Sequence, residues 1–435
     1  MSSAFVIAAP SSGSGKTSLS LGLLQALQNR ALNVQSFKCG PDYIDTLLHS
    51  SITGKPGINL DLFFNSADQL RELFYKYSKQ SDISVVEGVM GLFDGFNRAE
   101  GSTASIAKSL NLPVVLIVDA KASAYSIAPI LYGFKHFDPE IKLAGVIFNR
   151  VGSEGHYQYL KEAADDIEIP VLGYLPNNKE FHLPERYLGL NFDEQDDIKT
   201  TVNKIANQIS KTLNLDLLLQ SSSLNLAEQI KAETISKDKG SLKIAVSKDE
   251  AFTFTYYENL QGLSALGEIE YFSPLHDNCL PNADFVYLSG GYPEKHLEKL
   301  SKNHSMIESI QKYIRSGGKM LAECGGMMYL GKQIIDDAGN AFSMAGIFDF
   351  DTSMKHKKLH LGYRKLELGN VIVKGHEFHY SEILIDKDTE TCGRIVSAKD
   401  NPVNVSLYKK NNCYASYMHI YWGHNSIYNI LFNTK

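Results

Sequence analysis

The sequence predicts an α/β protein of two domains, and the first domain is expected to be a doubly wound parallel sheet with a phosphate-binding loop. Runs that are apolar on both faces alternate with helix-length segments through the first half, which is typical of a parallel sheet covered on both sides. The segment GSGKT follows the first of these runs, at residues 13–17. The chain has 435 residues, more than one hydrophobic core usually supports, so a second domain is expected.

The expected strands of the first domain are separated by segments long enough for helices. They are Ala4–Ala8, Val34–Lys38, Ile83–Gly88, Leu112–Ala120, Leu143–Arg150 and Ile169–Pro176. A doubly wound sheet places its chemistry at the carboxyl ends of its strands. Polar residues that close these runs are therefore candidates for a site.

The boundary between the domains is expected where this periodicity fades. From about Gln220 to Ser241 the chain is polar and charged. We expect a first domain over 1–222, a linker over 223–241 and a second α/β domain over 242–435. The second series of strands begins at Leu242 and includes the apolar runs that lead into Ser289 and Cys324.

The loop Pro10–Ser18 is the first candidate site, because the order strand, glycine-rich loop, helix forms a phosphate cradle. Backbone N–H groups in the loop face the phosphate oxygens, Lys16 reaches the terminal phosphates and Thr17 holds Mg²⁺. Pro10 stands where the usual pattern has glycine. The residues expected to bind the nucleotide here are Gly13, Ser14, Gly15, Lys16, Thr17 and Ser18.

Charged residues at the ends of two later strands complete this site. Lys38 closes one strand, and Asp42 and Asp45 follow it. Glu87 closes the next strand, among valines and glycines that leave a carboxylate in need of a cation. We expect Thr17, Glu87 and Asp42 to bind the metal and Asp45 to face substrate, although both aspartates could instead cap a helix.

Asn149 ends another strand of the first domain. Its amide could read an adenine edge, so we expect it to bind the nucleotide. A turn-forming asparagine is the alternative.

Cys324 is the centre of a second candidate site, in the segment GGKMLAECGGMMYLG. A nucleophile between a short apolar run and paired glycines fits a tight strand-to-helix turn. Gly290, Gly291 and Gly325 are expected to bring backbone N–H groups to a developing oxyanion. His419, at the end of a strand-like run, is expected to be the base that forms the thiolate. The alternative is that Cys324 is a small buried core residue.

Composition narrows the class of protein. Hydrophobic residues make up 43% of the chain, and no apolar stretch approaches the ~20 residues of a membrane span. The five cysteines are scattered and include no C-x-x-C pair, which indicates a reducing compartment without a zinc site. The formal net charge of −6 gives no reason to expect nucleic acid as a partner. We expect a cytoplasmic protein that binds neither membrane nor nucleic acid.

The sequence resembles the glutamine-dependent corrinoid amidoligases, the family of cobyrinic acid a,c-diamide synthases. The likeness covers nearly the whole chain, and its motifs include APSSGSGKTS, KCGPDYID, VVEGVMGLFDG, GVIFNRVGSEGH, LPERYLGL, LSGGYPE, AECGGMMYLG, GHEFHYSE and ASYMHIYW. It implies an N-terminal domain similar to dethiobiotin synthetase and a C-terminal class I glutamine amidotransferase domain.

By this resemblance, Cys324 releases ammonia from L-glutamine with His419 as base, and ammonia attacks a carboxylate that ATP has converted to an acyl phosphate. Lys38 would act with Lys16 on the transferred phosphoryl group, and Mg²⁺ would bridge the nucleotide oxygens. The implied substrate is a corrinoid macrocycle amidated on its a and c acetates, with Arg150 and Arg186 among the basic side chains that meet it. The resemblance leaves a homodimer open as the assembly.

The chain departs from the family at two places. Many class I amidotransferases carry glutamate two positions after the base histidine, where this chain has Tyr421. A Cys–His dyad is therefore expected. Tyr187 stands where a histidine is expected, and His376 and His379 could each line a site or be structural.

Two alternatives remain for the function. A related amidoligase could act on hydrogenobyrinic acid, nickel-sirohydrochlorin or a cobyric acid precursor, because such enzymes share both domains and most motifs. A partitioning-type ATPase with a phosphate loop is the second alternative. It predicts an amphipathic or basic tail that the sequence lacks.

Overall fold

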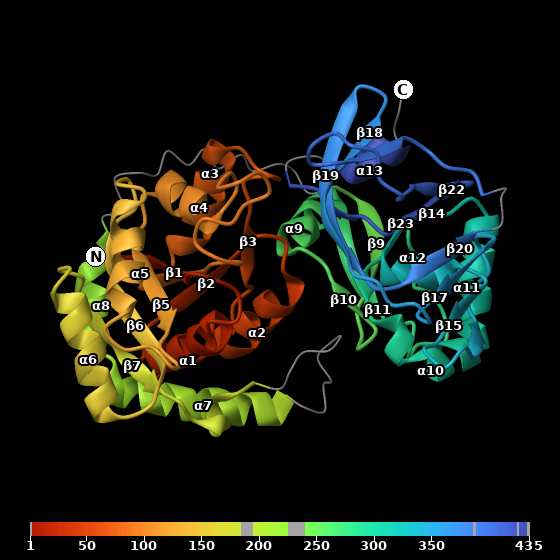
Figure 1. The fold of residues 1–435 in the computed structure, drawn as a ribbon. Coiled ribbons are helices and arrows are strands. Elements are labelled where there is room, and N and C mark those ends of the chain that lie inside the picture. The colour runs from red at the N-terminus through yellow and green to blue at the C-terminus, as the bar shows by residue number, and fades with distance from the viewer. Residues whose placement is uncertain (1, 184–194, 225–239, 386–388, 424–425, 433–435) are drawn as a thin grey trace. The chain divides into compact units, whose positions relative to one another are not determined.

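The computed structural model describes residues 2–183, 195–224, 240–385, 389–423 and 426–432 (Figure 1). The chain divides into two compact units, Met1–Thr234 and Ile235–Lys435. Most of the predicted linker, 223–241, lies outside the described residues, so its limits stay a prediction. Arg186 and Tyr187 also lie outside them.

The N-terminal unit is built on one large sheet in the order β3-β2-β4-β1-β5-β6-β7. Its strands are β1 Ser2–Ala8, β2 Val34–Cys39, β3 Ile58–Leu60, β4 Ile83–Glu87, β5 Val114–Asp119, β6 Leu143–Val151 and β7 Val171–Pro176. All neighbours on this path are parallel. The short β8, Ser223–Leu224, pairs antiparallel with the start of β1. The predicted doubly wound parallel sheet is confirmed.

Helices cover both faces of this sheet (Figure 1). They are α1 Lys16–Asn29, α2 Tyr43–Thr53, α3 Ala67–Ser78, α4 Thr103–Leu110, α5 Ile127–His136, α6 Glu154–Asp165, α7 Gln195–Thr212 and α8 Leu215–Ser221, with a 3-10 turn η1 at Lys179–Phe181. The leucines of α1 form a core with the sheet and with α7. A Cβ on Gly22 would lie 2.2 Å from Ile205 Cγ2, so the two helices approach closely.

The C-terminal unit contains a six-stranded sheet in the order β11-β9-β12-β14-β23-β22. Its strands are β9 Leu242–Ser247, β11 Gly267–Phe272, β12 Phe285–Leu288, β14 Lys319–Glu323, β22 Tyr408–Lys410 and β23 Cys413–Ser416. All are parallel to their neighbours except β22. The described helices of this unit are α9 Tyr257–Leu266, α10 Leu297–Lys302, α11 His304–Arg315, α12 Gly325–Leu330 and α13 Ile427–Phe432, with a 3-10 turn η4 at Pro293–Lys295.

Three smaller sheets complete this unit. One has the order β21-β18-β19-β24, another β16-β15-β17-β20, and β10 pairs with β13. Their strands are β10 Phe252–Phe254, β13 Gly290–Gly291, β15 Gln333–Ile335, β16 Ala341–Ser343, β17 Phe350–Ser353, β18 His360–Leu368, β19 Val371–His379, β20 Glu382–Ile385, β21 Arg394–Ser397 and β24 His419–Tyr421.

The apolar run ASYMHIYW differs from the prediction, because it forms two strands in two different sheets. Strand β23 ends at Ser416, whose Oγ accepts a hydrogen bond from the Met418 amide at 3.1 Å. The chain then leaves the six-stranded sheet, and β24 pairs with β19. His419 therefore begins a strand, where the sequence predicted the end of one.

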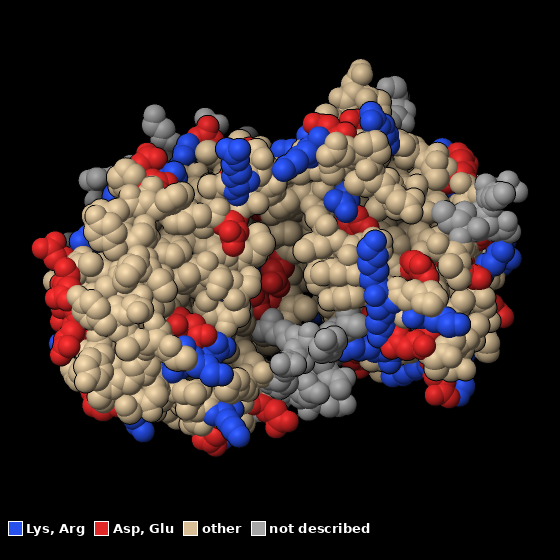
Figure 2. All heavy atoms as spheres, viewed as in Figure 1, with Lys and Arg blue, Asp and Glu red and all other residues tan. Residues whose placement is uncertain are grey.

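On the face seen in Figure 2, Lys and Arg are intermixed with Asp and Glu on each unit. Within the described residues, no helix has both the length and the apolar character needed to cross a membrane.

Candidate active sites in the two units

The phosphate loop lies between β1 and α1, as predicted from the sequence. Gly15 precedes α1 with a φ of 90°, and a Cβ on it would lie 2.1 Å from the Asn149 amide nitrogen. Lys16 Nζ donates to the Ser11 carbonyl at 3.1 Å and to the Met90 carbonyl at 2.5 Å. The lysine is thus held across the loop, with its donors satisfied by backbone oxygens that a phosphate could replace.

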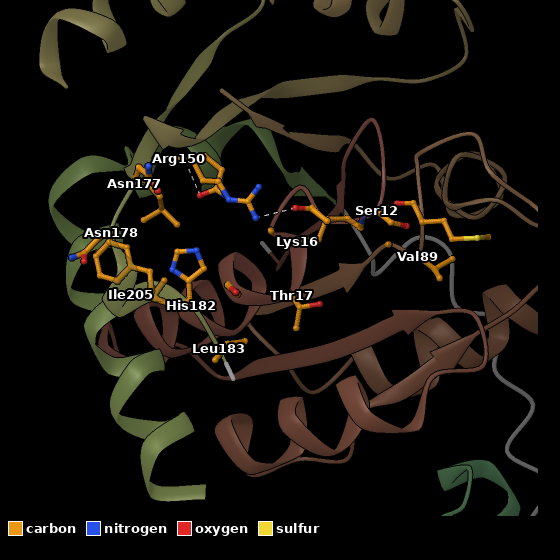
Figure 3. Close-up of a pocket in the computed structure, with 18 of the residues that line it drawn as sticks. Ser12, Lys16, Thr17, Val89, Arg150, Asn177, Asn178, His182, Leu183 and Ile205 are labelled. Carbon is orange, nitrogen blue, oxygen red and sulfur yellow. Dashed lines mark hydrogen bonds between the residues drawn. The ribbon is translucent and has the colours of Figure 1, made fainter. Parts of the chain in front are cut away.

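A cavity of about 470 Å³ opens beside this loop (Figure 3). His182, Asn178 and Ile205 lie on one side of the view, and Lys16 and Ser12 lie on the other. Its lining joins the loop to residues after β7: Ser12, Gly13, Gly15, Lys16, Thr17, Ser18, Lys38, Asp42, Gly88, Val89, Met90, Asn149, Arg150, Leu175, Pro176, Asn177, Asn178, Phe181, His182, Leu183 and Ile205. The cavity extends from a phosphate cradle toward mixed polar and apolar groups, which suits a nucleotide.

Buried charges of both signs converge next to the loop, where β2, β4 and α2 meet. Thr17 Oγ1 donates to Glu87 Oε1 at 2.9 Å. Lys38 Nζ lies 2.7 Å from Asp45 Oδ2 and 2.9 Å from Glu87 Oε1. His49 Nε2 lies 2.7 Å from the other oxygen of Glu87. The two buried carboxylates are thus matched by the Lys38 ammonium, as burial requires.

The pKa values of this cluster follow from burial and from these neighbours. Burial opposes the charge on Lys38, but Asp45 and Glu87 raise its pKa overall. Burial likewise opposes the charge on Glu87, and Lys38 lowers its pKa overall. Burial, aided by Lys38, lowers the pKa of Lys16 to about 8. Lys16 is therefore the cation of this site whose charge a bound phosphate would stabilise most.

The oxygen ligands near Thr17 are those of Glu87 and Asp45. Thr17 Oγ1 lies 3.4 Å from Asp45 Oδ2. Asp42, which the sequence predicts to bind the metal or to cap a helix, accepts a hydrogen bond on Oδ1 from the Asp45 amide at 2.9 Å and caps α2. Burial and the neighbouring Asp45 raise the pKa of Asp42 to about 6. A hydroxyl and two carboxylates are hard oxygen donors and fit Mg²⁺.

Asn149 and Arg150 both contact the phosphate loop. Asn149 Nδ2 donates to the Ser14 carbonyl at 2.9 Å, and its predicted contact with the nucleotide stays a prediction. Arg150 Nη2 donates to the Gly13 carbonyl at 3.0 Å, and Arg150 forms an ion pair with Asp119. Figure 3 shows the arginine extending toward the loop. Arg150 thus lines the cavity beside the phosphate loop, and its contact with the macrocycle stays a prediction.

Cys324 occupies a sharp turn between β14 and α12. Its φ of 47° is unusual for a residue with a side chain, and its amide donates to the Ser416 carbonyl at 2.7 Å. Such strain is typical of a nucleophile at a strand-to-helix turn. A Cβ on Gly325 would lie 2.7 Å from Pro293 Cδ and 3.0 Å from the Gly291 nitrogen. Only glycine lets these two segments pack this closely beside the sulfur.

His419 lies beside Gly290, the first glycine of the pair Gly290 and Gly291. A Cβ on Gly290 would lie 2.3 Å from His419 Cε1 and 3.4 Å from Cys324 Cβ. Gly290 is therefore in contact with both the cysteine and the histidine. The fold brings together the five residues that the sequence assigned to this site: Cys324, His419, Gly290, Gly291 and Gly325.

Burial keeps both partners of this pair neutral. Burial, followed by the effect of Glu294, raises the pKa of Cys324, and burial lowers the pKa of His419 to about 3. This is the state before the reaction, in which the His419 imidazole has not yet accepted the proton of the Cys324 thiol. Thiolate formation then depends on groups that stabilise the imidazolium.

The two other histidines of this region are buried and hydrogen-bonded. His376 Nδ1 lies 2.7 Å from the Tyr256 hydroxyl, and its ring stacks on His419 with centroids 4.9 Å apart. His379 contacts the Ser381 carbonyl at 2.8 Å and Glu377 at 2.8 Å. His376 thus lines the site, and His379 supports the segment behind it.

His360, Glu377 and His379 also place possible metal-ligand atoms within 4.8 Å of one another. Arg364 pairs with Glu377, and His379 contacts the same carboxyl group directly. The charge of this cluster is therefore already balanced by protein groups, and we assign no metal to it.

A phosphate-loop α/β domain followed by an α/β domain with a strained cysteine beside a buried histidine defines a class of protein, the glutamine-dependent ligases that use a nucleotide. Comparison with known families agrees with this class. Residues 5–190 match the CobQ/CobB/MinD/ParA nucleotide binding domain, and residues 243–427 match the CobB/CobQ-like glutamine amidotransferase domain.

Whole-length relatives identify the family. The chain is 42% identical to the cobyrinate a,c-diamide synthase of Listeria innocua over 97% of this chain and 96% of the relative. It is 41% identical to that of Caldanaerobacter subterraneus, over 96% and 94%, and 39% identical to that of Salmonella typhimurium, over 96% and 95%. The chain belongs to the cobyrinate a,c-diamide synthase family. It is a carbon–nitrogen ligase with glutamine as nitrogen donor, which favours the amidoligase reading over a partitioning-type ATPase.

Some residues of both sites were missed by sequence reasoning. His49 lies within α2, and Asn178 and His182 follow β7, so none closes a strand. Glu323, which directly precedes the nucleophile, was also missed. The run LAE before Cys324 held a signal, because a glutamate in an otherwise apolar buried strand needs a polar partner.

Proposed function

We propose that this enzyme amidates the a and c acetate side chains of cobyrinic acid, using ATP and glutamine, through acyl-phosphate intermediates. The observation that carries the proposal is that one chain holds both a phosphate-loop cavity and a cysteine–histidine site. The substrate follows from the names of relatives that match the whole chain.

The amidotransferase unit supplies ammonia. Cys324 gives its proton to His419, and the sulfur attacks the side-chain amide carbon of glutamine. Backbone N–H groups at Gly290, Gly291 and Gly325 are the candidates to stabilise the oxyanion. The tetrahedral intermediate collapses to a thioester as ammonia leaves with the proton from His419, and water then releases glutamate.

The N-terminal unit activates the carboxylate. An oxygen of the macrocycle carboxylate attacks the γ-phosphorus of ATP, and ADP leaves. Lys16 and Lys38 stabilise the charge on the transferred group, while Asn149 holds the loop in place. Ammonia attacks the acyl phosphate, and phosphate leaves. Because an acyl phosphate hydrolyses in open water, the activated site must exclude bulk water.

Thr17, Glu87 and Asp45 are the residues that would hold Mg²⁺, which when bound neutralises charge on the phosphate oxygens. The Lys38 ammonium forms ion pairs with the same two carboxylates. We place the enzyme in the cytoplasm and leave open whether it forms a homodimer.

Substrate choice is tested with purified protein, ATP, Mg²⁺, glutamine and each of three macrocycles, namely cobyrinic acid, hydrogenobyrinic acid and nickel-sirohydrochlorin. Charged contacts to the carboxylates of such a ring discriminate poorly between rings that differ in their central metal. Mass spectrometry is therefore expected to show two amide groups gained on cobyrinic acid, a monoamide first, and measurable amidation of the metal-free analogue. Amidation of nickel-sirohydrochlorin alone would overturn the substrate assignment and leave the two-site chemistry standing.

A further inference from the structure

Two positions after His419, where many class I amidotransferases carry the glutamate that orients the histidine, this chain has Tyr421. Another residue must therefore orient His419. The ring of Tyr421 packs edge-on against Tyr256, with centroids 5.3 Å apart and an angle of 79°. Tyr421 thus belongs to an aromatic cluster. A neutral imidazole still needs a partner that fixes which nitrogen carries the proton.

We propose that Glu323, the residue directly before the nucleophile, is the positioning carboxyl group for His419. Its Oε2 lies 3.9 Å from His419 Nδ1, and both side chains are 1% exposed. This inference rests on the proposed glutaminase function and adds a third member to the cysteine–histidine pair. Contacts of this kind are often long in ligand-free sites and shorten when the reacting complex forms.

Three strands hold the carboxyl group of Glu323 in place. Glu323 ends β14, and its Oε2 accepts a hydrogen bond from the Tyr287 hydroxyl of β12 at 2.7 Å. Its Oε1 accepts from the Ile420 amide of β24 at 3.1 Å. The second contact ties the carboxyl group to the strand that carries His419. The distance between the two side chains is thus fixed by backbone as well as by packing.

The imidazole is confined on its other sides as well. The ring of His376 stacks on it at an interplanar angle of 17°, and Gly290 leaves no room for a side chain beside its Cε1. With one face covered and the Cε1 edge crowded, the carboxyl group of Glu323 near Nδ1 favours the tautomer that carries its proton on Nδ1. A proton on Nδ1, directed at Glu323, leaves the Nε2 lone pair available for the thiol of Cys324.

Glu377, a nearby carboxyl group, is engaged elsewhere. Glu377 pairs with Arg364 and contacts His379. Glu323 lies within ion-pair distance of His419. Burial raises the pKa of Glu323 to about 8, against the opposing effect of the Tyr287 and Ile420 donors. Ionisation of Glu323 would supply the charge that stabilises the imidazolium once it has taken the thiol proton.

The test compares Glu323→Gln with Tyr287→Phe. Glutamine keeps the size of the side chain but cannot ionise, whereas phenylalanine removes a hydrogen bond to the same carboxyl group and leaves the carboxyl in place. We expect Glu323→Gln to lower the glutaminase kcat by about 10²- to 10⁴-fold with KM for glutamine nearly unchanged. We expect Tyr287→Phe to lower kcat by less than about 10-fold.

Two further readouts separate positioning from structure. The first is the rate at which 6-diazo-5-oxo-L-norleucine labels Cys324, followed by mass spectrometry of its peptide, which should fall in Glu323→Gln as kcat does. The second is amidation with ammonium chloride, which should stay at the wild-type level. If Glu323→Gln does not fold, Glu323→Asp, which retains a carboxyl group, should keep more glutaminase activity than His419→Ala.

Different results would contradict the positioning role of Glu323 and the proposed glutaminase function on which it rests. Full glutaminase activity and full labelling in Glu323→Gln would overturn the positioning role while Cys324 and His419 remain the reacting pair. Equal losses in Glu323→Gln and Tyr287→Phe, or equal losses of the glutamine and ammonia activities, would show a structural role and also overturn it. Full glutaminase activity in His419→Ala would instead contradict the proposed function.

Discussion

Replacing Cys324 with alanine is expected to abolish amidation that uses glutamine and to preserve amidation that uses ammonium chloride. The sulfur forms the bond to glutamine, so no other group can replace it in releasing ammonia. The cavity beside the phosphate loop belongs to a different compact unit, and its residues do not include Cys324. The measurement is product formation with each nitrogen donor at saturating ATP.

Cys413→Ala is a matched control for this experiment. Cys413 is also buried, and it lies on β23, which pairs with the strand leading into Cys324. The control should keep both activities, because its sulfur has no place in the reaction. Equal loss of the glutamine and ammonia activities in Cys324→Ala would contradict separate sites for the two reactions.

Replacing Lys16 with alanine is expected to lower amidation about 10²- to 10³-fold with either nitrogen donor. Lys16 lies across the phosphate loop, where its ammonium would meet the terminal phosphates. Glutaminase activity measured without ATP should remain, because the cysteine site does not include this lysine. The measurement is ADP release and amide formation, with glutamate release as the second readout.

Lys161→Ala provides the control, since Lys161 is an exposed lysine on α6. It should turn over at the wild-type rate. Wild-type turnover in Lys16→Ala would contradict the assignment of the loop to ATP.

The strands near both sites were predictable because their apolar runs are long and continuous. The strands Val114–Asp119 and Leu143–Val151 are buried on both faces. Their sequences are therefore almost continuously apolar, which is the pattern that predicts a parallel sheet. Strand β3 was missed because three residues are too few to show a period. The division of ASYMHIYW into two strands was missed because the apolar residues of the run continue on both sides of Ser416. The chain turns out of the sheet there, where the Met418 amide donates to Ser416 Oγ, and the composition of the run does not reveal this turn.

The candidate sites were predictable where the local chain decides the geometry. A glycine loop before a helix and a cysteine between a strand and two glycines need no distant partner to be recognised. Asp42 and Asp45 could not be told apart, because which of them faces Thr17 depends on the start of α2. Glu323 and His419 are 96 positions apart, and their approach follows only from the order of β14, β19 and β24 across two sheets.

The central claim is that ATP activates a carboxylate of the macrocycle before ammonia from glutamine attacks it. Its most direct test uses cobyrinic acid labelled with ¹⁸O in its carboxylates, together with ATP, Mg²⁺ and glutamine. If an acyl phosphate forms, one ¹⁸O atom should appear in the released phosphate for each amide made, as read by mass spectrometry of phosphate. Productive amidation that releases phosphate without ¹⁸O would contradict activation by phosphoryl transfer.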